Sequence, residues 1–243
     1  MKGLLLVIIS AVAAAAVSFY KPKEFVPPGT VQISHNMYFD RDEVTCLSWV
    51  EFQFWTRNMY GSNSAEYKFT LIDTTNWDEH SLKTAWHNAK PLALEMRNLP
   101  VVGVSYEQAI AFCKWRTERV KYFLSIKNSK SKIDFEYRLP TEKEWEFVSD
   151  GSGEVFSNKA AANLKWQDNR ESKLLPVETF KPNLHGIYDL TGNAAEMLLE
   201  KNIAKGGSWK DSPEDSRNGK KQHYTKASPW LGFRCVCEIK DNN

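Results

Sequence analysis

The chain has 243 residues, of which 42% are hydrophobic and 26% are charged. This composition is typical of a globular protein with a sizeable core, not of a disordered chain. The 32 basic and 30 acidic side chains nearly balance, which argues against a basic nucleic-acid-binding surface. A mean hydropathy of −0.50 excludes a protein with several membrane spans.

The first 18 residues have the pattern of a secretory signal peptide. Lys2 precedes an almost entirely apolar run over residues 3–17, and the small residues Ala16 and Ser18 predict cleavage after Ser18. The alternative is an uncleaved anchor helix, although the run is shorter than the roughly 20 residues that a span needs. We therefore expect an extracytoplasmic protein, periplasmic or secreted, in which residues 19–243 form a single domain without a stable membrane span.

Four cysteines follow, at Cys46, Cys113, Cys235 and Cys237. An even number in an exported chain favours disulfides, and four cysteines allow three pairings. Cys235 and Cys237 lie in a predicted strand over residues 233–237, where residues two apart cannot bridge each other. The alternative is a Cys-X-Cys metal site, which lacks a second ligand cluster at a suitable spacing.

The first predicted elements are a turn into a short strand over residues 25–33 and an amphipathic helix over residues 47–60. The apolar residues on or near one face of that helix are Trp49, Val50, Phe52, Phe54 and Trp55. Residues 61–98 are polar and irregular. They contain His80 and His87, whose separation favours a solvated face over a metal pair.

The clearest helix begins at Ser105, where Ser105 and Gln108 form a capping box. Apolar residues follow at helical spacing: Ala109, Phe112, Cys113, Val120 and Phe123. A surface loop rich in lysine and serine is predicted over residues 125–132.

A second capping box, Thr141 with Glu144, opens a short helix that carries Trp145 and Phe147. From Gly151 onward the regular periodicity fades and the apolar clusters become short. The sequence therefore predicts a loop-rich α+β domain and not a βαβ array.

Six blocks in order resemble the formylglycine-generating enzyme (sulfatase-modifying factor) domain family. They lie at residues 99–105, 111–115, 137–147, 186–196, 206–209 and 231–235. The resemblance covers nearly the whole chain after the signal peptide. It implies a loop-rich α+β variant of the C-type lectin fold.

Enzymes of this family oxidise a substrate cysteine to formylglycine, using O2 and a copper ion held by two cysteines. These cysteines lie just after a Gly-Gly-Ser-aromatic block, which here ends in Ser208 and Trp209. The two cysteine positions hold Asp211 and Ser216. Because neither a carboxylate nor a hydroxyl replaces a soft thiolate pair for Cu(I), the resemblance implies a degenerate site without this activity and without copper.

Iron-dependent relatives of this fold use a set of histidines and a carboxylate. The histidines here are His35, His80, His87, His185 and His223, and none forms a close motif with a carboxylate. Asp211, Glu214 and Asp215 form a local acidic cluster near the expected groove. It is interpreted either as a site for a cation or basic ligand or as a solvated loop.

Two structural features of the family are matched. The resemblance implies a disulfide between Cys113 and Cys235, while Cys46 and Cys237 either pair with each other or stay as free thiols. It also implies a calcium site at Asp189, Gly192, Ala194 and Glu196, which offer two carboxylates and two backbone carbonyls. The alternative for Glu196 is a buried turn residue that bonds its own backbone.

The resulting functional hypothesis is an exported, non-catalytic binding or scaffold module, because block 111–117 resembles domains of gliding-motility and secretion lipoproteins. Its partner would be a protein or glycan in the cell envelope, and the polar segment over residues 210–229 would contact that partner. The residues considered for that contact are Lys210, Arg217, Tyr224 and Trp230. The alternative is an oxidoreductase of the formylglycine-generating type that acts on a cysteine of an exported protein through a rearranged metal site.

Overall fold

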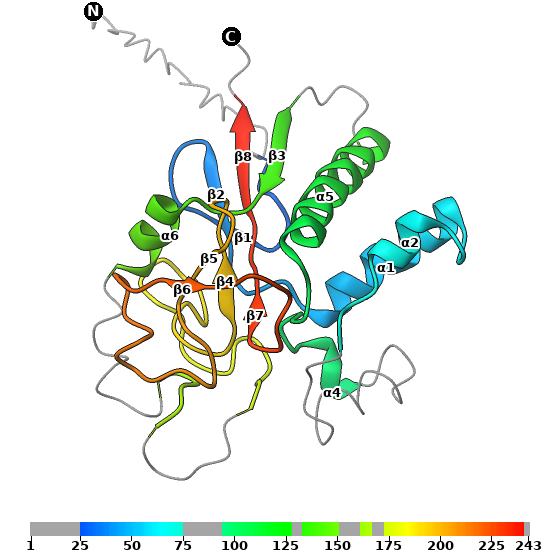
Figure 1. Cartoon of the computed structure of the whole chain (residues 1–243). Coiled ribbons are helices and arrows are strands. Elements are labelled where there is room, and N and C mark those ends of the chain that lie inside the picture. The colour runs from blue at the N-terminus through cyan, green and yellow to red at the C-terminus, as the bar shows by residue number, and fades with distance from the viewer. Residues whose placement is uncertain (1–24, 75–93, 128–132, 151–160, 167–172, 241–243) are drawn as a thin grey trace, which may run out of the picture.

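The computed structural model describes residues 25–74, 94–127, 133–150, 161–166 and 173–240. The predicted signal peptide and both His80 and His87 lie outside these residues. Within them, no helix has the length and apolar character needed to cross a membrane. The described chain forms two four-stranded sheets with helices around them, so the predicted α+β class is confirmed (Figure 1).

The first sheet is antiparallel and has the order β1-β2-β8-β3. Its strands are β1 (Thr30–Gln32), β2 (Met37–Asp40), β3 (Asp134–Arg138) and β8 (Val236–Lys240). In β8, Cys237 is paired with Tyr38 on one side and Tyr137 on the other. The C-terminal strand is therefore central, between two strands that come from distant parts of the chain.

The second sheet has the order β6-β5-β4-β7. Its strands are β4 (Ala195–Met197), β5 (Ile203–Lys205), β6 (Gln222–His223) and β7 (Leu231–Gly232). The strand predicted over residues 233–237 is only partly correct, because residues 233–235 connect β7 of this sheet to β8 of the other. This crossing places Arg234 between the two sheets.

The described helices are α1 (Cys46–Tyr60), α2 (Ala65–Phe69), α4 (Leu94–Arg97), α5 (Tyr106–Lys127) and α6 (Glu142–Ser149). Both predicted capping boxes are present: Ser105 with Gln108, and Thr141 with Glu144. Two short helices, α2 and α4, lie in the region expected to be irregular. The helix α5 continues to Lys127, so the loop predicted over residues 125–132 is wrong at residues 125–127, where no helix-breaking residue stands, and its remainder lies outside the described residues.

The main core lies where α1 and α5 pack on the sheets. The ring of Trp49 stacks on that of Phe112 at 5.7 Å, and Phe233 meets Phe112 edge-on at 5.5 Å. Figure 1 shows α1, α2 and α5 on one side of the strands and α6 on the other. A second cluster, centred on Trp145 and Phe39, lies under α6.

Some apolar residues of the predicted helix faces are not buried. Phe54 is 58% exposed, Phe123 49% and Phe147 59%. Apolar residues run around more of each helix than a single packing surface covers, so periodicity alone overestimates the core. The exposed rings of α1 and α5 form part of a surface described below.

Candidate functional site

The segment after β5 forms a turn held by its own polar side chains. Ser208 is fully buried, and both its backbone N–H and its Oγ donate to Oδ2 of Asp211, at 2.9 and 2.6 Å. The carbonyl of Asp211 accepts from the amide of Lys165 at 3.0 Å. Asp211 therefore acts as a structural residue of this turn, with one carboxylate oxygen committed to Ser208.

Ser216 is also buried within the segment. Its Oγ donates to the carbonyl of Ser212 at 2.8 Å. Gly207, at φ +70°, lies against it so closely that a Cβ atom there would come within 2.0 Å of the Ser216 hydroxyl. The two residues that the resemblance assigns to the copper-binding cysteine positions thus carry oxygen side chains that stabilise the loop.

The expected acidic cluster is not a cluster in space. Asp211 points to Ser208, Asp215 accepts from the Ser212 hydroxyl at 2.6 Å, and Glu214 pairs with Arg217. Each carboxylate has its own neighbour, so the three do not converge on one cation. Across the described residues, no group of three or more histidine, cysteine or acidic side chains is placed to hold a metal ion.

The four cysteines lie in the core. The sulfur atoms of Cys113 and Cys235 are 3.5 Å apart as free thiols, and their disulfide stays a prediction. Burial raises the pKa of Cys46 and that of Cys237 to about 12. Cys235 faces Cys113, and among the described residues no third ligand gathers with Cys235 and Cys237, which disfavours the Cys-X-Cys metal site.

The donors predicted for calcium do not fit that ion as they are arranged. The two carboxylate oxygens of Glu196 accept from the guanidinium of Arg234 at 2.5 and 2.7 Å, and Oε2 also accepts from the indole of Trp145 at 2.7 Å. Oδ2 of Asp189 accepts from the amide of Glu178 at 2.9 Å. Since both oxygens of Glu196 are committed to Arg234, the set keeps only Asp189 as a carboxylate for calcium, fewer than that ion prefers.

The neighbouring backbone is instead held by amides. The carbonyl of Asn163 accepts from the amide of Asn193, and the Asn163 side chain donates to Oδ1 of Asn193 at 3.0 Å. Gly192, at φ +83°, passes so close that a Cβ would meet the Asn163 carbonyl at 2.4 Å. These contacts account for the close approach of Asn163 to Gly192 and Asn193 without an ion.

A group of buried carboxylates around Arg234 was not foreseen. Asp40 and Glu43 are buried, and Asp42 lies between them. Burial raises the pKa of Asp42 and that of Asp189 to about 6, and that of Glu43 well above its ordinary value. Asp40, Asp42 and Glu43 are close in the chain, but they lie far in sequence from Asp189 and from Arg234, and no sequence spacing connects these segments.

The proposed contact segment is partly exposed. The ammonium of Lys210 lies 4.2 Å from the centre of the half-buried Trp230 ring, and Arg217 is exposed. The prediction that Tyr224 belongs to the contact surface is wrong, because only 5% of this side chain is exposed and it packs in the main core. It follows the last pair of β6 and turns inward.

Comparison with known proteins supports the resemblance. The chain is 31% identical over 200 residues to the inactive C-alpha-formylglycine-generating enzyme 2 of Mus musculus, covering 68% of this chain and 59% of that one. It is 26% identical over 125 residues to the formylglycine-generating enzyme of Mus musculus, covering 44% of this chain and 28% of that one. The chain thus spans less than two thirds of the length of these relatives.

The fold also matches a solved structure. The crystal structure of CarF superposes with a TM-score of 0.57 at 19% identity, covering 88% of this chain and 96% of that chain. The family described as "Sulfatase-modifying factor enzyme 1-like domain" matches residues 10–239. The chain therefore belongs to the sulfatase-modifying factor enzyme 1-like domain family, as a member that lacks the catalytic cysteines.

Proposed function

We propose that this protein is an exported, non-catalytic binding module. The observation that carries the proposal is the hydrogen bonding within the loop over residues 207–216. Asp211 and Ser216 serve the loop's own hydrogen bonds, with no thiol for copper. The loop is preserved as a shaped surface while the chemistry of the family's enzymes is lost.

Two further observations support a binding role. A relative that is 31% identical is itself named an inactive formylglycine-generating enzyme. Within the loop, exposed Lys210 forms a cation–π pair with the half-buried ring of Trp230, a combination suited to contacts with proteins and with glycans. The apolar run before Ser18 favours a place outside the cytoplasm, in an envelope, secretion or gliding-type assembly.

A copper titration tests the loss of chemistry. The protein without residues 1–18 is titrated with Cu(I) under reducing conditions and then assayed for O2 consumption with a cysteine-containing peptide. We expect neither tight binding nor turnover. The variant that combines Asp211→Cys and Ser216→Cys provides the comparison in which soft ligands are present. Sub-micromolar Cu(I) binding by the unaltered protein, with peptide oxidation, would establish the oxidoreductase instead.

Cross-linking in the native envelope tests the binding role. A photoreactive amino acid replaces Lys210 in the full chain, and a matched chain carries it at Leu184, which is 97% exposed in another loop. A defined protein or glycan adduct from position 210 and its absence from position 184 support the proposal. If no adduct forms from position 210, or from any other exposed position that is tested in the full chain, the result contradicts the proposal. The N-terminal peptide of the native protein reports export, and we expect it to begin at Phe19.

A further inference from the structure

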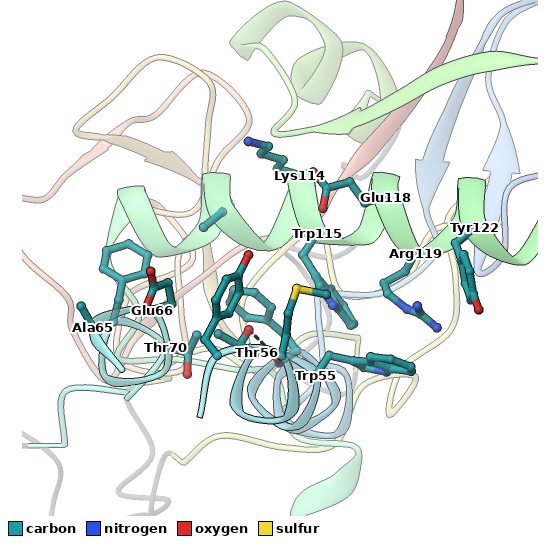
Figure 2. A pocket seen from close by; sticks show the side chains of 15 residues that line it. Trp55, Thr56, Ala65, Glu66, Thr70, Lys114, Trp115, Glu118, Arg119 and Tyr122 are labelled. Atoms are coloured by element: carbon teal, nitrogen blue, oxygen red, sulfur yellow. Dashed lines mark hydrogen bonds between the residues drawn. The ribbon is translucent and has the colours of Figure 1, made fainter. Parts of the chain in front are cut away.

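An apolar hollow of the described surface is lined by none of the loop residues 207–216. It is a groove of about 890 Å³ between α1, α2 and α5. Phe52 and Trp115 contribute to its lining from the core side, and Met59 and Phe69 lie on its α1 and α2 walls. Figure 2 shows Trp115 and Arg119 reaching from α5 toward α1, where Trp55 lies below Arg119.

The apolar surface continues beyond the groove. Large side chains of these three helices are strongly exposed: Phe54 58%, Met59 69%, Tyr60 55%, Phe69 44%, Tyr122 55% and Ile126 66%. An extended surface of this kind on a soluble protein marks an interaction site. Its aromatic, methionine and arginine content is that of the centre of a protein–protein interface, whereas a small ligand would leave most of it uncovered.

The lining of the groove includes the charged residues Glu66, Lys114, Glu118 and Arg119, of which Glu66 and Arg119 lie at opposite ends (Figure 2). The guanidinium of Arg119 lies 3.6 Å from the centre of the Trp55 ring and 5.0 Å from that of Tyr122. Among the described residues it forms no ion pair with a carboxylate, so its N–H groups are available to a partner. Glu66 lies at the opposite end, on α2 (Figure 2).

We propose that this groove binds an amphipathic α-helix of a partner protein. The partner helix would place its apolar side chains against Met59, Phe69 and Trp115, an acidic residue at Arg119 and a basic residue at Glu66. A groove between helices suits this mode of recognition, in which affinity comes from apolar anchors and orientation from charges at the ends. The inference rests on the proposed binding function and adds a second surface to it, with the class of partner that this surface would bind.

Fluorescence anisotropy with synthetic peptides tests the groove directly. The probe is a labelled helix of about 18 residues with a leucine stripe, glutamates at one end and lysines at the other. The control peptide has the same composition with the stripe scrambled. We expect the striped peptide to bind the protein at least about tenfold more tightly than the control.

Matched variants locate the binding. Met59→Asp and Arg119→Glu change exposed or half-exposed side chains, so the fold is retained, and each should weaken binding about tenfold. Leu184→Asp, remote from the groove and 97% exposed, should leave binding unchanged. A peptide with lysines in place of the glutamates should bind Arg119→Glu better than the unaltered protein.

Several results would overturn the inference. These are equal binding of the striped and scrambled peptides, or equal weakening by Leu184→Asp and Met59→Asp. A dimer that Met59→Asp dissociates in sedimentation velocity would assign the groove to a second copy. Binding to phosphatidylglycerol vesicles with the same dependence on Met59 would assign it to a membrane surface. A native partner that is still cross-linked in Met59→Asp contradicts the groove alone, whereas the absence of any partner contradicts the proposed function.

Discussion

Arg234 and Glu196 form a bidentate ion pair in which both side chains are completely buried. Arg234 also donates to the backbone carbonyls of Asp40, Arg41 and Tyr188, so one side chain joins the end of β2, the segment before β4, and β4 itself. A buried charge that loses its partner is strongly destabilising.

Replacement of Arg234 should therefore be more harmful than replacement of Glu196. Arg234→Met leaves Glu196, Glu43 and Asp42 without their shared cation, and we expect a loss of about 3–5 kcal/mol in the free energy of unfolding. Glu196→Gln leaves Arg234 close to the remaining carboxylates and should cost less, about 1–3 kcal/mol. Urea denaturation measures both, and the reverse order would contradict this account of the network.

The pH dependence of stability should contain a contribution from Glu43. One of its oxygens accepts from Asn193, while Oε2 is buried without a hydrogen bond within the described structure. Because its pKa is raised in the folded state, the folded protein holds the proton more tightly, and this contribution to stability is lost as pH rises. Glu43→Gln should thus be more stable than the unaltered protein at about pH 7.5.

That advantage should shrink toward about pH 4, where Glu43 is protonated in both states. The measurement is the difference in the free energy of unfolding between the two proteins across this range, since other acidic groups cancel in the difference. Glu51→Gln, on the exposed surface of α1, is the control and should show no such trend. A constant difference for Glu43→Gln would contradict the raised pKa.

Calcium should have little effect on this protein. Glu196, one of the two carboxylates of the predicted calcium site, is held by Arg234 and Trp145. We expect the melting temperature in millimolar calcium and in excess chelator to agree within about 1 °C. A clear rise with calcium that disappears in Asp189→Ala would show that Glu196 leaves Arg234 when the ion binds.

Gly207 should be sensitive to the smallest substitution. In Gly207→Ala, the new methyl group would overlap the Ser216 hydroxyl, and the residue would sit at φ +70°. We expect a cost of at least about 2 kcal/mol, of which the backbone conformation contributes about 1–2 kcal/mol. Ser216→Gly in the same chain should restore part of the loss, as measured by thermal unfolding. Gly219→Ala, where no atom lies within 4 Å of the added carbon, is the control.

The predicted bridge between Cys113 and Cys235 is tested by oxidation. These residues are 122 positions apart, so a bridge would close a long loop and add about 5 kcal/mol in the chain-entropy account. Peptide mass mapping without reduction identifies the pair, and unfolding with and without a reductant measures its effect. Cys46→Ser should leave both unchanged. A bridge that involves Cys46 or Cys237 would require different core packing.

Local features of the fold were accessible from the sequence, and contacts between distant segments were not. The capping boxes at Ser105 and Thr141 fix helix starts within a few residues, so they could be predicted. The position of β8 between β2 and β3 depends on pairings across the chain and left no local signal. The same holds for the carboxylates that surround Arg234.

The candidate site was only partly predictable for a similar reason. Family blocks located Asp211 and Ser216, but not the inward hydrogen bonds that make them structural. The α1 pattern indicated buried rings at Phe54 and Trp55, yet both contribute to an exposed surface. Burial depends on which neighbour covers a helix face, and a single segment does not encode that neighbour.

In the turn that Asp211 and Ser216 stabilise, some positions hold the backbone in shape and others can be substituted without disturbing it. Its frame depends on inward bonds from Ser208, Ser212 and Ser216, whereas Lys210 and Arg217 face outward. Substitutions at the outward positions leave the frame intact. The loop therefore offers a surface whose specificity could diversify among relatives, or be redesigned, at little cost to folding.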